Sequence, residues 1–226
     1  MTPCIICGLD ERLRWLWPWF AAQLDAHTGG LPVRVYDFGV RTRIDRPMHH
    51  GLKQGWFGKP AAILDTLNST EHDAAIWIDL DVELFADIPA LFEGLSPDTE
   101  IAGTPDPWMP NKFLITPQPY VEPGHGYTDP AGMVLNTGLL YVRRGCRYAF
   151  EWRRLTLFGK FRGDEEALAE VCRVGDPGVA ALAPEVMVMK LGPVAWSKNA
   201  KAIHWTGQDG KDIIARKILD TKRRMV

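Results

Sequence analysis

The chain has 226 residues, of which 46% are apolar and 24% are charged, so it can form one soluble domain with a sizeable core. The formal net charge of −2 gives no general attraction to nucleic acid. No stretch approaches the ~18 apolar residues of a membrane span, and the N-terminus lacks the basic and apolar pattern of a signal peptide. We therefore expect a single cytoplasmic domain over residues 1–226.

The first half of the chain alternates apolar strand-like runs with helical patterns. Asp10 suits the N-cap of the first helix, Pro18 should bend or restart that helix, and Pro60 suits the first position of the second helix. In chain order, the expected elements are strand 4–9, helix 10–27, strand 33–38, helix 59–69, strand 74–79 and a short helix at 88–95.

The second half contains a long loop, because seven prolines within 104–130 exclude regular structure there. The strand after this loop is expected to be broken at Asn136-Thr137-Gly138. In chain order, the expected elements are strand 100–104, loop 104–130, strand 133–144, helices 146–158 and 164–173, strand 202–205 and a helix from about 211. This alternation predicts a Rossmann-like α/β/α domain with a mostly parallel central sheet, which binds ligands at the carboxyl ends of its strands.

Four cysteines occur, and two of them form a C-x-x-C at Cys4 and Cys7. These two flank Ile5-Ile6 in an apolar run, and no second C-x-x-C completes a four-cysteine zinc site. We therefore predict buried, reduced thiols rather than a metal or redox site.

The segment IWIDLDVELF (76–85) places two carboxylates one position apart at the end of the third predicted strand. In an extended chain, residues i and i+2 project to the same side, so Asp79 and Asp81 converge. Without a partner they would repel each other, and neutralising either should not destabilise the ion-free protein. A divalent cation removes the conflict, and Mg²⁺ is commonly held by one or two carboxylates and substrate phosphates. The alternative is two solvated aspartates at a strand end.

Four segments together resemble the GT-A glycosyltransferases, in particular the glycogenin and lipopolysaccharide galactosyltransferase type. In chain order they are AAIWIDLDVELFADIPALF with its D-x-D, LNTGLLYVRR with an N-x-G, GDEEALAEV on a predicted helix, and IHWTGQDGK with H-x-x-G and a lysine. They span residues 74–211, and the likeness over residues 1–73 is looser. The resemblance implies the GT-A fold and transfer of a sugar from a nucleotide-diphosphate donor, such as a UDP-sugar, to a saccharide or other acceptor with retention of configuration.

The resemblance also implies roles for individual residues. Asp79, Asp81 and His204 would hold Mn²⁺ or Mg²⁺, and a nitrogen ligand shifts the preference towards Mn²⁺. Asp164 would be a catalytic residue facing the sugar and the acceptor. The residues implied to bind the donor are Gly8, Asp10, Lys59, Asp79, Leu80, Asn136, Gly207 and Lys211.

Three positions depart from the family pattern, and one of them is Ala169, where the family has an Asn. The family's lysine follows the glycine of H-x-x-G by three residues and precedes Pro-Trp, whereas Lys211 follows Gly207 by four and precedes Asp212. The family's Gln after the helical Asp is Glu165 in this chain.

Each candidate residue also has a purely structural interpretation. His204 could be a packed histidine, and Asn136 could hold a turn or bulge. Asp164 could be a helix N-cap, and Lys59 could be solvated ahead of its helix.

Two other classes of protein are considered. One is a non-catalytic nucleotide-sugar binding protein on the same fold. The other is a haloacid-dehalogenase-like phosphatase, because the segment WIDLDVEL superficially resembles the nucleophile motif of that family. GDEEAL, however, has Leu168 where that family's second motif has its last Asp.

Two segments are candidates for contacts with partners. The proline-rich loop carries groups that could stack on a sugar acceptor, or it could be a structural cover; these groups are Asp106, Trp108, His125 and Tyr127. Residues 211–226 hold six basic and two acidic side chains, a net of +4. We expect a mobile basic segment that steers anionic donors or contacts anionic lipid peripherally, the alternative being a solvated helix end.

Overall fold

A six-stranded sheet forms the centre of the computed structural model, which describes residues 2–38, 57–107, 109, 114–115, 117–119, 129–158, 161, 163–189 and 198–224. In spatial order the strands are β2 (Val33–Asp37), β1 (Pro3–Leu9), β3 (Ala74–Ile78), β6 (Leu135–Arg143), β5 (Ile101–Pro105) and β7 (Val179–Ala181). β6 is antiparallel to both of its neighbours, and the other pairs are parallel. This mixed sheet, in which only β6 runs the opposite way among the described strands, confirms the predicted α/β fold.

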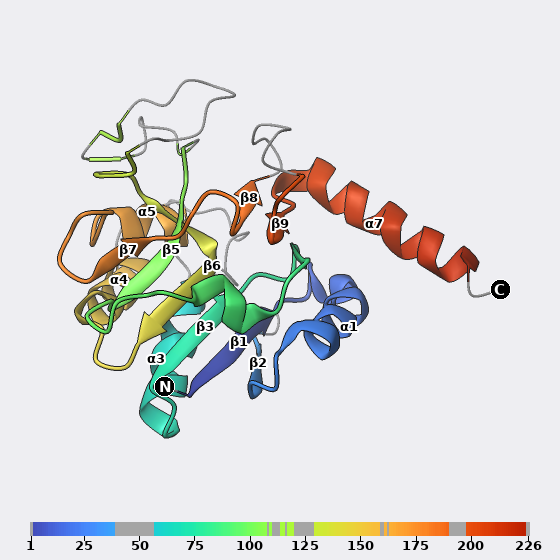
Figure 1. The fold of residues 1–226 in the computed structure, drawn as a ribbon, viewed down its shortest axis with the longest axis horizontal. Helices are drawn as coiled ribbons and strands as arrows, with labels where there is room; N and C mark the ends of the chain where they lie inside the picture. Colours follow the sequence, from blue (N-terminus) through green and yellow to red (C-terminus); the bar gives the residue numbers. More distant parts are fainter. Residues whose placement is uncertain are drawn as a thin grey trace.

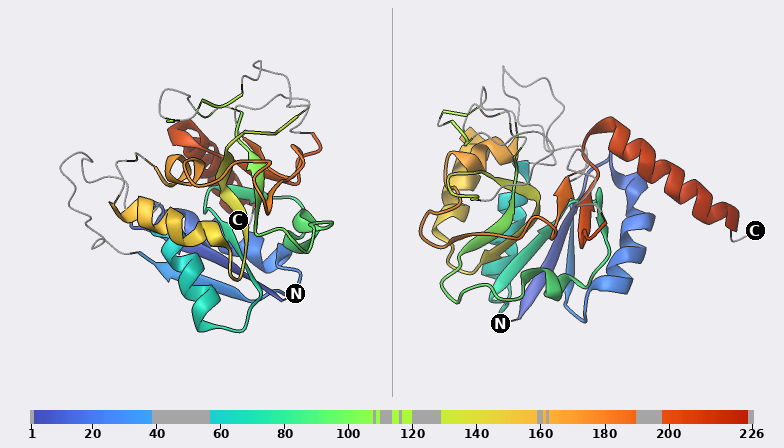
Figure 2. Two further views of the ribbon diagram at one scale, coloured as in Figure 1. Left: turned by 90° about the vertical axis from the view of Figure 1, so that its left-hand side faces the viewer. Right: turned by 45° about the horizontal axis from the view of Figure 1, so that its top comes forward.

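Helices cover both faces of the sheet (Figures 1 and 2). One face carries η1 (Arg14–Leu16) and α1 (Trp17–His27), and the other carries α3 (Lys59–Ser69), α4 (Arg147–Phe158) and α5 (Asp164–Ala169). Side chains alternate along β3, so that Ile76 and Ile78 pack towards α1 whereas Ala75 and Trp77 pack towards α3. The core therefore lies in two layers, one on each side of the sheet.

A second, smaller sheet lies beside the carboxyl end of β3. Its strands are β4 (Val82–Leu84), β9 (Ala202–His204) and β8 (Val188–Met189), and η2 (Ile88–Phe92) follows β4. The chain closes with α7 (Gly207–Arg224), whose C-terminal part extends away from the rest of the molecule (Figures 1 and 2).

Local sequence explains how two of the helices begin. α3 starts one residue before Pro60, as predicted, because proline lacks the N–H that a first turn leaves unpaired. The first predicted helix is divided. The Leu13 amide donates to Asp10 Oδ1 at 2.8 Å, a 3₁₀ turn follows, and Pro18 lies in the first turn of α1. Asp10 therefore caps a turn, and Pro18 starts the α-helix rather than bending it.

Several predicted boundaries were wrong. β6 continues through Asn136-Thr137-Gly138, and the irregularity lies instead in its pairing with β5, between Gly103 and Pro105. α5 ends at Ala169, and α7 begins at Gly207, earlier than predicted. The short strands β4, β7 and β8 were not predicted, because two or three residues give no periodic signal.

The four cysteines are free and buried, as predicted. Burial raises the pKa of Cys7 to about 12 and the pKa of Cys146 to about 11, so both stay protonated at neutral pH. Among the described residues, no helix combines the length and apolar character needed to cross a membrane.

Candidate metal and donor site

Three side chains converge where β3 ends and the small sheet begins. Asp79 follows β3, Asp81 precedes β4, and His204 is the last residue of β9, paired in register with Val82. His204 Nε2 lies 3.3 Å from Asp81 Oδ1 and 3.8 Å from Asp79 Oδ2. One ligand atom from each residue lies within 4.8 Å of the others. Two carboxylates and an imidazole at this spacing could hold a divalent cation.

Asn136 fixes the orientation of His204. The Gly138 amide donates to Asn136 Oδ1 at 2.8 Å, which identifies that atom as the oxygen. The same oxygen lies 3.1 Å from His204 Nδ1, so Nδ1 carries a hydrogen, and Nε2 is the nitrogen that faces the carboxylates. A ligating histidine is normally held in this way through its other ring nitrogen, so the residues fit a metal ion.

Gly138 provides the room that the imidazole occupies. A Cβ at this position would lie 2.4 Å from His204 Cε1 and 2.5 Å from His204 Nδ1. The glycine of the N-x-G segment is thus required by the approach of β9 to β6.

Lys59, the first residue of α3, is a buried cation that pairs with Asp79 and with Asp164. Its Nζ lies 2.9 Å from Asp79 Oδ2 and 2.9 Å from Asp164 Oδ2, and its side chain is 3% exposed. It also donates to the carbonyl and the hydroxyl of Thr137, each at 3.2 Å. One ammonium therefore holds two carboxylates together and ties α3 to β6.

The two aspartates of the D-x-D have opposite electrostatic surroundings. Burial, together with the charge of Asp81, raises the pKa of Asp79, although Lys59 opposes this and Trp77 Nε1 donates to its Oδ1 at 2.7 Å. Burial also disfavours the charge of Asp81. His204 and Lys211 outweigh it, and they hold the pKa of Asp81 below its ordinary value. Lys211 Nζ lies 2.8 Å from Asp81 Oδ2.

A second pair of carboxyl groups lies beyond Asn136. Asn136 Nδ2 lies 3.4 Å from Asp106 Oδ2 and 3.4 Å from Glu165 Oε1. Burial, followed by the charge of Asp106 and a hydrogen bond with it, raises the pKa of Glu165 well above its ordinary value. Glu165 therefore tends to keep its proton, and Asn136 connects this pair to His204.

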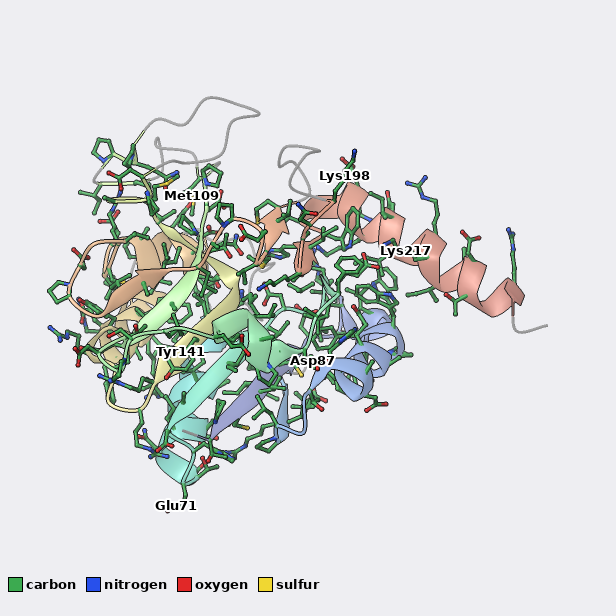
Figure 3. The ribbon with its side chains drawn as sticks, in the orientation of Figure 1. Glu71, Asp87, Met109, Tyr141, Lys198 and Lys217 are labelled. Atoms are coloured by element: carbon green, nitrogen blue, oxygen red, sulfur yellow. The ribbon has the colours of Figure 1, made fainter. Side chains whose placement is uncertain are left out.

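Two lysines of α7 pair with the carboxylates on either side of Val82, the first residue of β4. Lys211 pairs with Asp81, and Lys217, labelled in Figure 3, lies 2.7 Å and 2.6 Å from the two carboxylate oxygens of Glu83. Glu83 also accepts from Trp205 Nε1 at 2.8 Å, and Lys217 Nζ lies 5.0 Å from the centre of the Trp205 ring. The start of α7 is thus fixed beside the candidate metal ligands.

The remaining predicted donor residues lie around the same sheet edge. Gly8 is covered by aromatic rings, because a Cβ there would lie 2.2 Å from Phe38 Cε2. Asp10 follows β1, and the side chain of Leu80 is buried in the core. Gly207 has φ +71° with open space around it, so its backbone conformation favours glycine.

Sequence reasoning missed the residues that support the site. Thr137, Glu83 and Lys217 contact residues that lie far from them in the sequence, so only the structure identifies them. A Thr between Asn and Gly carries no signal of its own. The Asp106 side chain of the predicted acceptor loop is buried beside Asn136. The other residues predicted for that loop lie outside the described ranges: Trp108, His125 and Tyr127.

No protein-family model and no curated protein matches the sequence. Solved structures do match. A glycosyltransferase involved in glycosylation of the major capsid of PBCV-1 gives a TM-score of 0.67 at 12% identity, covering 97% of this chain and 100% of that one. The bifunctional glycosyltransferase WbbM gives 0.65 at 12%, covering 92% and 46%. Galactosyltransferase LgtC, solved with donor and acceptor sugar analogs, gives 0.57 at 11%, covering 90% and 87%. At these identities the likeness shows the fold, which is the GT-A fold of glycosyltransferases.

Proposed function

We propose that this protein is a metal-dependent glycosyltransferase that uses a nucleotide-diphosphate sugar as donor. The observation that carries the proposal is the Asp79–Asp81–His204 group at the carboxyl end of a central strand of a GT-A fold. That edge is where open α/β sheets bind their ligands. Two carboxylates and an imidazole would leave further coordination positions of a divalent ion open, and the phosphate oxygens of a donor could fill them.

Asp79, Asp81 and His204 would hold the ion, with Mn²⁺ favoured over Mg²⁺ by the imidazole. When bound, the ion supplies Lewis-acid stabilisation of the negative charge that develops on the leaving nucleoside diphosphate. Lys211, at the start of α7, adds a cation that can turn to the diphosphate. Gly8, Asp10, Leu80 and Gly207 remain proposed contacts to the donor.

Lys59 has a role that follows from its burial. Its ammonium has protein acceptors around it, so it would act on the donor through Asp79 and Asp164, which it holds in place. Without the Lys59 ammonium, the carboxylate at either position would move or take up a proton, because the other carboxylate close by disfavours its ionised form.

The sugar is proposed to lie next to Asn136 and Asp164. Asp164 Oδ2 is paired with the Lys59 ammonium, but it accepts no hydrogen bond from the described part of the chain. It can therefore accept one from a hydroxyl group of the sugar. Glu165, whose pKa is raised by burial, adds a carboxyl group that can donate a hydrogen bond when it is protonated. Asp164 is therefore our candidate for the residue beside the reacting carbon. Retention of configuration is an expectation from the resemblance.

A non-catalytic nucleotide-sugar binding protein is the second candidate, since the same residues would bind without turnover. The phosphatase alternative loses its support, because the fold matches glycosyltransferases over most of the chain. For the acceptor we propose a saccharide or glycoconjugate. The basic α7 is proposed to contact anionic lipid headgroups peripherally.

The test is a panel of nucleotide-sugars, each added with Mn²⁺ or with chelator, followed by thermal unfolding and by detection of released nucleoside diphosphate. The proposal expects at least one donor that stabilises the protein only with Mn²⁺ and is slowly consumed. Stabilisation without any consumption, with and without a panel of saccharide acceptors, favours the binding protein. If no nucleotide-sugar stabilises the protein, the proposal is wrong.

A further inference from the structure

Lys211 lies where its positive charge would repel the metal ion that the site is proposed to bind. Asp81 turns its Oδ1 to His204 Nε2 at 3.3 Å and its Oδ2 to Lys211 Nζ at 2.8 Å. A cation coordinated by either oxygen would thus have the ammonium on the same carboxylate group. Two positive charges this close repel each other, and burial of the Asp81 side chain, which is 8% exposed, limits screening by water.

We propose that Lys211 is a resident counter-cation of this site, and that it leaves Asp81 for the diphosphate of the donor when the metal ion binds. This inference rests on the proposed function, since it needs a divalent ion and a nucleoside diphosphate as ligands. It adds that Lys211 weakens binding of the ion alone, and that it strengthens binding of the ion and the diphosphate together.

The attachment of α7 allows such a change of partner. Glu83 holds Lys217 and Trp205 through hydrogen bonds of 2.6 to 2.8 Å, and none of these three is a candidate metal ligand. The helix can therefore stay in place while Lys211 moves on its flexible four-carbon stem, which suits lysine better than arginine. Glu83, Trp205 and Lys217 are, in this proposal, positioning residues that keep Lys211 within reach of both partners.

The consequence is cooperative binding. Without diphosphate, the ammonium neutralises one of the two aspartate charges that attract the ion. With diphosphate present, the ammonium gains new acceptors, and Asp81 is free to coordinate. Coupling of this kind is reciprocal, so the ion must raise the affinity for the diphosphate by the same factor as the diphosphate raises the affinity for the ion.

The experiment measures Mn²⁺ binding by titration calorimetry, with and without UDP, for the parent, Lys211→Met and Arg216→Met. Arg216→Met is the matched control, because it removes one positive charge from the same helix at an exposed position whose Nε donates, within the described part of the chain, only to the Asp212 carbonyl, at 3.3 Å. Lys211→Gln serves as a second variant at the test position. Thermal unfolding in chelator verifies that each variant is folded.

For Lys211→Met without UDP, we expect Mn²⁺ to bind roughly five- to tenfold more tightly than to the parent, because a like charge on the shared carboxylate is gone. The factor by which UDP strengthens Mn²⁺ binding should fall by a similar amount. Arg216→Met should stay within about twofold of the parent in Mn²⁺ alone, since its side chain is exposed and its charge is screened by water and salt.

Unchanged Mn²⁺ affinity in both Lys211 variants would overturn the inference while leaving the proposed function intact. The same would follow if Arg216→Met tightened Mn²⁺ binding as much as Lys211→Met, because the effect would then be a general one of helix charge. If no variant bound Mn²⁺ with or without UDP, the proposed metal site itself would be wrong, and the inference would fall with it.

Discussion

At the scale of single residues, the two aspartates of the D-x-D should behave differently when neutralised. The sequence alone suggested mutual repulsion, so that either Asn variant would be tolerated. The structure changes this expectation for Asp81, which lies 2.8 Å from Lys211 and whose pKa is lowered by His204 and Lys211. For Asp79, burial and the charge of Asp81 raise the pKa, so the fold stabilises its charged form less than that of Asp81.

We therefore predict that, in chelator, Asp81→Asn lowers the free energy of unfolding by ~1–3 kcal/mol, as expected for loss of a charged hydrogen bond. Asp79→Asn should change it by less. Urea denaturation of both variants and the parent gives the comparison. If both variants lost the same free energy of unfolding, the ion pair of Asp81 with Lys211 and the repulsion at Asp79 would not differ in their effect on stability.

Glu165 should make stability fall as pH rises. Its folded-state pKa lies above the ordinary value of 4.5, so its contribution is fully present below that value. The contribution is lost as pH rises through the raised folded-state pKa, because the unfolded chain gives up the proton first. Glu165→Gln, which needs no proton, should flatten this part of the curve. The free energy of unfolding across a pH series is the measurement, and parallel curves for parent and variant would contradict the assignment.

At the scale of elements, β6 and β9 come close enough that only glycine fits between His204 and Asn136. Gly138→Ala should displace the imidazole and abolish Mn²⁺-dependent stabilisation by UDP, while overpacking costs ~1–3 kcal/mol of stability. Gly163→Ala is the control, because a Cβ there meets nothing within 4 Å and its φ of −148° suits any residue. Thermal shifts with Mn²⁺ and UDP decide, and a metal response retained in Gly138→Ala would show that His204 is not needed.

Elements with long apolar patterns could be predicted from sequence, and contacts between distant elements could not. α3 was placed at its observed bounds, because Pro60 and the buried face both mark it. The D-x-D, Asn136 and His204 could be nominated from local segments and the family resemblance. The ion pair of Lys59 with Asp164 joins residues far apart in the chain, and only the folded sheet brings them together.

The continuity of β6 was missed for a related physical reason. Asn136, Thr137 and Gly138 favour turns in isolation, but tertiary pairing with β3 and β5 overrides that preference. The residues that break the local pattern are also the ones that contact His204 and Lys59. Local disagreement with the fold is expected at a functional site.

At the scale of the whole molecule, α7 links the site to a basic surface that extends away from the domain. Truncation after Gly210 removes Lys211 and a net charge of +4, so we predict weaker binding of UDP-Mn²⁺ and a smaller dependence of that binding on salt. Full-length protein should also sediment with vesicles containing anionic lipid, and the truncated protein should not. Equal donor affinity, salt dependence and vesicle binding would leave α7 a purely structural element. The predicted mobility of this segment remains a prediction.

We propose above that Asp79, Asp81 and His204 form one metal site for a nucleoside diphosphate. The most direct measurement is calorimetric titration of UDP into parent, His204→Ala and Asp81→Ala, each with Mn²⁺ and with chelator. We predict Mn²⁺-dependent binding by the parent and its loss in both variants, whose unfolding transitions in chelator remain cooperative. UDP binding that is the same with and without Mn²⁺, or that survives in His204→Ala at parental affinity, would contradict it.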